Sequence, residues 1–85
     1  MTEFNYVIKD AQGIHARPAG MLVKTAGKLG SKITIQCNGK EADAKRLLAV
    51  MGMGVKCGNE ITVKVEGENA EADAAQIKEF LEENL

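Results

Sequence analysis

The sequence predicts an α+β fold in which a four-stranded sheet carries three helices on one face. Four segments alternate apolar and polar residues, so each has one apolar face. Three further segments have an apolar stripe at helical spacing. Their order is strand, helix, strand, strand, helix, strand, helix, and a two-layer sandwich buries every apolar face. The 85 residues, 45% of them hydrophobic, are expected to form one domain over residues 1–85.

The first strand and the first helix are joined by a short turn. Residues 4–8 alternate and predict a strand, and residues 10–13 have the composition of a turn. A helix is expected from Ala16 to about Leu29. Its apolar stripe consists of Ala19, Leu22, Val23, Ala26 and Leu29.

The middle of the sequence predicts a hairpin followed by a short helix. Residues 33–37 alternate again, and Asn38-Gly39 is a strong signal for a tight turn into a short strand over residues 40–43. An apolar helix is expected over residues 44–52, with Asp43 as its N-cap because a carboxylate there accepts free backbone N–H groups.

The last third predicts the most regular strand, over residues 61–65, and a helix over residues 70–83 that Asn69 can cap. The buried side of this helix is expected to carry Ala70, Ala74, Ile77 and Leu81, with Phe80 alongside. The face of the sheet away from the helices is expected to meet water and to carry Thr34, Gln36, Thr62 and Lys64.

Composition excludes several classes of protein. The net charge of −1 argues against nucleic acid as a partner, and no apolar run approaches the roughly 20 residues of a membrane span. The first residues lack the basic start and apolar stretch of a signal peptide, so a cytoplasmic protein is expected. Cys37 and Cys57 lack the paired spacing of a metal site and are expected to be free thiols. A disulfide between them stays open as an alternative.

Charge is unevenly distributed along the chain. Residues 1–40 carry six basic and two acidic side chains, whereas residues 41–85 carry five and ten. No acid lies between Asp10 and Glu41, and that stretch contains His15, Arg17, Lys24, Lys28, Lys32 and Lys40. Such a run is ordinarily a solvated face. The alternative is a surface that attracts a small anion or an acidic partner.

His15, the only histidine, lies where the first helix begins, two residues before Arg17. Pro18 fits the first turn, where backbone N–H groups have no intrahelical partner. The N–H groups of Ala16 and Arg17 then stay free at the positive end of the helix dipole and can bind an anion. A guanidinium binds phosphate oxygens well, although a cation in the first turn destabilises a helix. The ordinary interpretation is that His15 only caps the helix and that Arg17 is only a solvated charge. The helix start, the nearby arginine and the acid-free stretch together favour a phosphate site instead.

Residues 13–19, Gly-Ile-His-Ala-Arg-Pro-Ala, resemble the active-site signature of the HPr family. These proteins are the histidine phosphocarriers of the bacterial phosphoenolpyruvate-dependent sugar phosphotransferase system. The resemblance spans the chain, through the order of elements, the Asn38-Gly39-Lys40 turn and the approach to the last strand over residues 58–62. It implies an open-faced βαββαβα sandwich with an antiparallel sheet.

The resemblance also implies a function for the helix start. His15 would accept a phosphoryl group on Nδ1 from enzyme I and pass it to a sugar-specific enzyme IIA. Arg17 would stabilise the group as it arrives and leaves. The protein would then be a carrier rather than an enzyme, and no cofactor or metal is expected.

The short second helix and one side of the first are the expected docking surface for these partners. Leu47, Leu48 and Met51 are more apolar side chains than so short a helix buries easily, although at least one is expected in the core. By resemblance, the surface also includes Ala16, Gly20, Lys24 and Gly27 on the first helix. The contacts are expected to be transient and the protein monomeric.

One position departs from the resemblance. Many members of the family carry a regulatory serine at the start of the second helix, and this chain has Arg46 there. Serine-based regulation is therefore not expected, and Arg46 extends the basic rim. The alternative function is that of a regulatory adaptor, which would use the same fold to bind transcription factors or enzymes.

Overall fold

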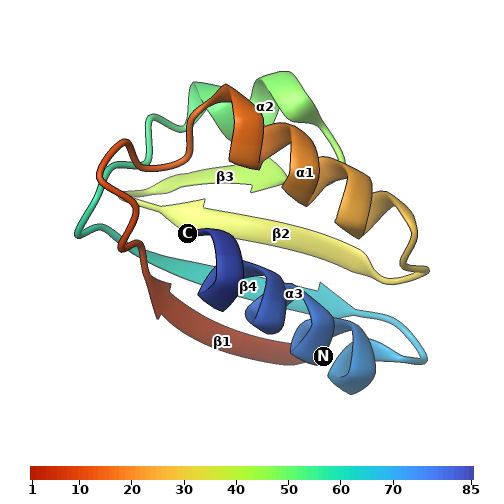
Figure 1. Ribbon diagram of the computed structural model, residues 1–85. Coiled ribbons are helices and arrows are strands. Elements are labelled where there is room, and N and C mark those ends of the chain that lie inside the picture. The colour runs from red at the N-terminus through yellow and green to blue at the C-terminus, as the bar shows by residue number, and fades with distance from the viewer.

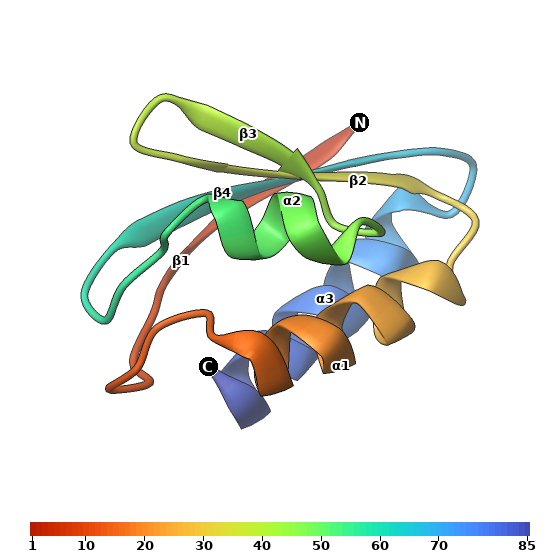
Figure 2. The same cartoon turned by 90° about the horizontal axis from the view of Figure 1, so that it is seen from above.

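The computed structural model describes residues 1–85 and contains the seven elements in the predicted order (Figure 1). They are β1 (Thr2–Val7), α1 (Ala16–Gly27), β2 (Lys32–Cys37), β3 (Lys40–Asp43), α2 (Leu47–Gly52), β4 (Glu60–Glu66) and α3 (Ala70–Asn84). The strands form one sheet in the order β1-β4-β2-β3, and all neighbours are antiparallel. Figures 1 and 2 show the three helices on one face of this sheet. The predicted open-faced sandwich is confirmed.

The inner face of the sheet and the apolar stripes of the helices share one core. The register places apolar residues opposite each other, for example Ile35 opposite Val63. The largest hydrophobic side chains with almost no exposure are Ile8, Leu22, Ile33, Ile35, Ile61, Ile77, Leu81, Val50, Val63 and Val65. The hydroxyl of Tyr6 donates to the Leu81 carbonyl at 3.0 Å and ties β1 to α3. The core is therefore mainly aliphatic, and this buried hydrogen bond joins the sheet to a helix.

The outer face of the sheet is polar and has no helix over it. The four residues expected there, Thr34, Gln36, Thr62 and Lys64, are partly exposed. The hydroxyl of Thr62 donates to Oδ1 of Asn5 on the neighbouring strand at 2.9 Å. Such an exposed cross-strand bond contributes little to stability because water competes for both groups.

Helix α1 ends earlier than expected. The predicted end at about Leu29 is wrong, since α1 stops at Gly27 with Lys28 as its C-cap. The backbone N–H groups of Lys28 and Leu29 donate to Thr25 and Ala26, three residues back. The chain therefore tightens into a 3₁₀-like turn after Gly27, and the side chain of Leu29 still reaches the core.

Helix α2 begins later than expected, and Asp43 is not its N-cap. The helix starts at Leu47 with Arg46 in the cap position. The N–H of Ala44 donates to the carbonyl of Ile33 at 2.9 Å, so this residue is still tied to β2. The carboxylate of Asp43 accepts the N–H of Lys45 at 2.9 Å and closes an Asx turn that leads from β3 into the helix.

The apolar side chains of α2 are distributed differently from the expectation. Leu47, Leu48 and Met51 are 40%, 83% and 38% exposed, so none of the three belongs to the core. Val50 is the residue of α2 that is fully buried. A helix of six residues can turn only one narrow face inward, and here Val50 occupies it.

Helix α3 begins after Asn69 as predicted, although the Asn69 side chain makes no capping hydrogen bond. The Asn69 carbonyl accepts the N–H of Asp73 at 2.8 Å and starts the helical bonding. Asp73 is buried, and its carboxylate accepts a hydrogen bond from the hydroxyl of Ser31, which is also buried, at 2.5 Å. This bond joins the start of α3 to the loop between α1 and β2.

We expect the substitution Ser31→Ala to lower the free energy of unfolding by about 1–3 kcal/mol, because it leaves the buried Asp73 carboxylate without its donor. Urea unfolding followed by circular dichroism measures the loss. Thr62→Val removes an exposed hydroxyl of similar size and is expected to change stability by less than about 0.5 kcal/mol. Equal losses in the two variants would contradict the structural importance assigned to the buried bond.

Candidate functional site

The loop before α1 is held in place by close packing at Gly13. This glycine has φ +67°, and a Cβ atom there would lie 2.2 Å from the carbonyl oxygen of Val55. The next residue, Ile14, donates its N–H to the same oxygen at 3.0 Å and is buried. Only glycine permits this approach of the two chain segments. As a result the following residue, His15, has a defined position.

His15 occupies the N-cap position of α1 with extended backbone, and its side chain makes no capping bond. Its carbonyl accepts the N–H of Ala19 at 2.9 Å, the first hydrogen bond of the helix. The N–H groups of Ala16 and Arg17 therefore have no intrahelical partner, and Pro18 has no N–H. The imidazole is 36% exposed, so a reagent can reach it. These features confirm the predicted placement of His15 at a helix start.

A shallow depression of about 240 Å³ lies beside the imidazole. It is lined by Asp10, His15, Arg17, Pro18, Met21 and Asn84. The guanidinium of Arg17 is exposed and lies in no ion pair, since the one ion pair of the structure joins His15 and Asp10. A cation without a partner beside the positive end of a helix favours the binding of an anion there.

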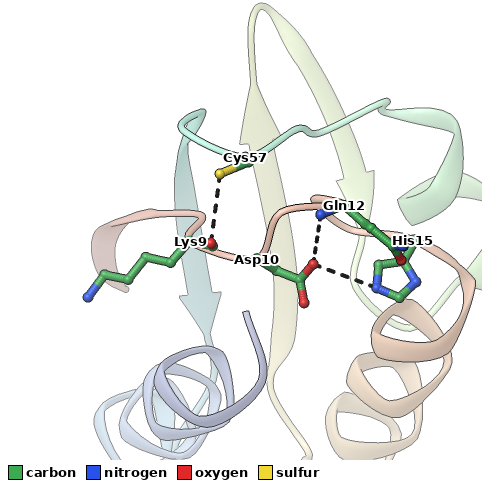
Figure 3. A network of polar contacts seen from close by, with 5 residues as sticks. All are labelled: Lys9, Asp10, Gln12, His15 and Cys57. Carbon is green, nitrogen blue, oxygen red and sulfur yellow. Dashed lines mark hydrogen bonds and ion pairs between the residues drawn. The ribbon is translucent and has the colours of Figure 1, made fainter.

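The carboxylate of Asp10 faces one edge of the imidazole (Figure 3). Its Oδ1 lies 3.8 Å from Nε2 of His15 and also accepts the N–H of Gln12 at 2.8 Å. The second ring nitrogen, Nδ1, has no hydrogen-bond partner within the protein. The two ring nitrogens are therefore distinguished, and Nδ1 is available for a bond to an incoming group.

Sequence reasoning missed three residues of the depression. The sequence predicts only a turn at Asp10, although its position as the last acid before the acid-free stretch is a signal. Met21 has an exposed side chain one turn after Arg17, and Asn84 comes from the end of α3. No local sequence pattern predicts that Asn84 lines the depression, because its position beside His15 depends on how α3 packs beside α1.

The lysines of the acid-free stretch do not gather around the imidazole. Of its six basic residues, only His15 and Arg17 line the depression. Lys28 lies at the other end of α1, about 18 Å along the helix, and Lys32 and Lys40 lie on strands. The ordinary interpretation, a solvated face, describes these three. Lys24 is exposed about two turns after Arg17 on α1.

The residues expected in the docking surface are accessible. Leu47, Leu48 and Met51 are exposed on α2, which packs against α1. On α1, Ala16, Lys24 and Gly27 are exposed and Gly20 is partly exposed. Figures 1 and 2 show α1 and α2 next to each other on the same side of the molecule. The structure thus brings the two groups of residues together.

The structure contains no group of three or more His, Cys, Asp or Glu side chains that could hold a metal ion. Cys37 is buried and Cys57 is exposed, and both are free thiols, as expected. Crossing a membrane takes a longer and more apolar helix than any of the three.

The comparisons with known proteins identify the family. The family model described as the PTS HPr component phosphorylation site matches residues 2–83. The chain belongs to the HPr family. The phosphocarrier protein HPr of Mycoplasma capricolum subsp. capricolum is 42% identical over 81 residues, which cover 95% of this chain and 91% of that protein. A solved structure of a histidine-containing phosphocarrier protein of Mycoplasma has a TM-score of 0.93 at 39% identity and covers 96% of this chain and 93% of that one.

Two solved structures of HPr from Thermoanaerobacter tengcongensis, each 34% identical to this chain, are also similar. One has a TM-score of 0.91 and covers 96% of this chain and 92% of the other. The second, of a dimer, has a TM-score of 0.77 with coverages of 98% and 95%. As an HPr protein, the chain is a phosphocarrier of the sugar phosphotransferase system, a system that carries phosphoryl groups on histidine for sugar transport.

Proposed function

We propose that His15 is the phosphoryl carrier, that phospho-enzyme I is its donor and that an enzyme IIA domain is its acceptor. The observation that supports this is the unpartnered Nδ1 of a partly exposed imidazole at a helix N-terminus, beside the unpaired guanidinium of Arg17. Nδ1 attacks phosphorus, the bond between phosphorus and the donor breaks, and the phosphoryl group then lies near the free N–H groups of Ala16 and Arg17.

A carrier has to release what it accepts, which limits how tightly the site can hold phosphate. Extra stabilisation of ~2.8 kcal/mol would shift the transfer equilibrium about a hundredfold towards retention. One exposed arginine and two backbone donors make a moderate site, whereas a closed cage of several cations would trap the group. The partner enzymes then supply the remaining positioning and electrostatic stabilisation of the transition state. The chain thus acts as a relay and not as a catalyst.

The docking surface for both partners consists of the exposed faces of α1 and α2. Leu47, Leu48 and Met51 provide apolar contact area. A Cβ atom at Gly20 or Gly27 would meet no atom within 4 Å outside its own stretch of helix, so packing against the rest of the fold does not require glycine at either position. Small residues and methionine suit a surface that has to fit more than one partner.

Truncation of Leu48, the most exposed of the three, is expected to lower kcat/KM for phosphorylation by enzyme I about fivefold to tenfold, a loss typical of an apolar interface anchor. Leu48→Ala is measured by varying its concentration against a fixed amount of enzyme I. The control is Val7→Ala, an apolar truncation at 44% exposure on β1. If both variants lost the same activity, α2 would not be the docking surface.

The proposed carrier function is tested first with phosphoenolpyruvate and enzyme I and then with enzyme IIA. The chain is incubated with the first two and its intact mass is measured, then enzyme IIA is added. We expect the gain of one phosphoryl group, its loss in acid, and its loss again when enzyme IIA is added. A regulatory adaptor that carries no phosphoryl group would show no gain in mass, and that result would favour the alternative function.

Regulation through a serine is not part of the proposed function. Arg46 occupies the cap position of α2, where the regulatory serine of many family members is expected. The one serine of the chain, Ser31, is 2% exposed and bonded to Asp73. A kinase therefore has no accessible serine to modify in the folded protein.

We further propose that the carrier acts as a monomer in the cytoplasm. Two free thiols are consistent with a reducing compartment. Transient contacts through an exposed surface need no second copy of the chain, although the HPr of Thermoanaerobacter tengcongensis has been solved as a dimer. Light scattering at micromolar concentration tests the monomer directly.

A further inference from the structure

We propose that Asp10 is a positioning residue for phosphoryl transfer. Its carboxylate holds the imidazole of His15 with the ring proton on Nε2, which leaves the lone pair of Nδ1 for phosphorus. This inference rests on the proposed role of His15. It adds a negative charge with a defined task to a site in which sequence reasoning found only cations.

The backbone and side chain of Asp10 are both held in place. Its N–H donates to the Leu85 carbonyl at 2.8 Å and its own carbonyl accepts the N–H of Gly13 at 2.9 Å. Its Oδ1 accepts the N–H of Gln12 at 2.8 Å, which fixes the carboxylate in an Asx turn. The same oxygen lies 3.8 Å from Nε2 of His15 (Figure 3). Two backbone hydrogen bonds and one to the carboxylate thus hold Asp10 beside one edge of the imidazole.

The chemistry of transfer gives this carboxylate a reason to face Nε2. When the neutral ring attacks, the Nδ1 lone pair forms the bond to phosphorus and the donor leaves with the electron pair of its own bond to phosphorus. The proton stays on Nε2, so the ring becomes an imidazolium. A carboxylate behind an imidazole selects the tautomer and stabilises the cation that forms, as in a Ser-His-Asp triad. Contacts of this kind are often long before reaction and shorten during it.

The surroundings of His15 make such a counter-charge useful. The helix N-terminus and Arg17 both attract the phosphoryl group, yet both oppose a positive charge on the ring. Asp10 is the one acidic residue lining the depression, and it lies at the Nε2 edge, whereas the phosphoryl group bonds at Nδ1. Its attraction for the imidazolium therefore acts at short range, and its repulsion of phosphate acts at longer range.

The proposal is tested with Asp10→Asn, which removes the charge while the amide oxygen can still accept the N–H of Gln12. Asp43→Asn is a matched control, because Asp43 also closes an exposed Asx turn, onto Lys45 at 2.9 Å, and lies outside the depression. We expect phosphorylation of Asp10→Asn by enzyme I to be about threefold to fivefold slower, the size of the effect of a partly exposed ion pair. We expect Asp43→Asn to react like the parent protein.

Two further measurements distinguish a positioning effect of Asp10 on His15 from a general structural effect. Phospho-His15 hydrolyses when water attacks phosphorus and Nδ1 leaves with the bonding pair, which is easier for a ring protonated on Nε2. Spontaneous hydrolysis of phosphorylated Asp10→Asn should therefore also be slower. Nitrogen-15 NMR of the neutral imidazole should show a smaller share of the tautomer with the proton on Nε2. Unfolding curves of the two variants are expected to coincide.

The outcomes distinguish this proposal from the one on which it rests. Equal rates for Asp10→Asn and Asp43→Asn would overturn the role of Asp10 and leave that of His15 intact. Faster phosphorylation of Asp10→Asn would mean that repulsion of phosphate dominates, which also overturns it. A parent protein that gains no phosphoryl group at all would instead contradict the proposed function itself.

Discussion

The substitution His15→Ala is expected to abolish phosphorylation by enzyme I and phosphoenolpyruvate. His15 is the only histidine of the chain, and its Nδ1 is the one unpartnered ring nitrogen at the depression. The imidazole makes no capping bond and is 36% exposed, so its removal should change the free energy of unfolding by less than about 0.5 kcal/mol. Intact mass after incubation with both reagents measures the result.

A second nucleophile is the main alternative source of labelling and can be controlled. Cys57 is exposed, and its Sγ lies 3.7 Å from the Lys9 carbonyl in the same region as the site (Figure 3). Cys57→Ser is expected to gain one acid-labile phosphoryl group at the rate of the parent protein. If His15→Ala retained a phosphoryl group, the assignment of the carrier residue would be wrong.

The fold could be predicted because its signals are local. Alternation over residues 61–65 places every second side chain on one face, and Asn38-Gly39 specifies a tight turn without help from the rest of the chain. The start of α2 could not be predicted in this way. It depends on the hydrogen bond from Ala44 to Ile33, a contact between distant residues that holds the chain in the sheet past the apparent cap.

The same division applies to the candidate site. The coincidence of His15, Arg17 and Pro18 at a helix start is visible in the sequence because all its parts lie within one turn. Asp10 reaches the imidazole because the loop turns back at Gly13, whose positive φ is set by its packing against Val55. Leu47, Leu48 and Met51 are all exposed because α2 is short and turns only Val50 fully into the core.

Arg17→Ala is expected to slow phosphoryl transfer from enzyme I about tenfold to a hundredfold, because it removes a guanidinium that is available to stabilise the transferred group. This guanidinium lies in no ion pair and has no structural bond to lose. Donors aimed at developing charge contribute up to about this much once docking excludes water from the site. Arg17→Lys keeps the charge but loses the planar array of donors, so an intermediate rate is expected. Single-turnover transfer at saturating enzyme I separates this effect from weaker docking.

The matched control for Arg17→Ala is Lys28→Ala, which removes an exposed cation from the opposite end of α1 and should leave the transfer rate unchanged. The free energy of unfolding is expected to change in the opposite direction to the transfer rate. A cation in the first turn of a helix is unfavourable by about 0.3–1 kcal/mol, so Arg17→Ala should raise the free energy of unfolding while it slows transfer. A structural arginine would lose stability and rate together. Equal transfer rates for the two variants would mean that the anion binds to the backbone N–H groups of α1 alone.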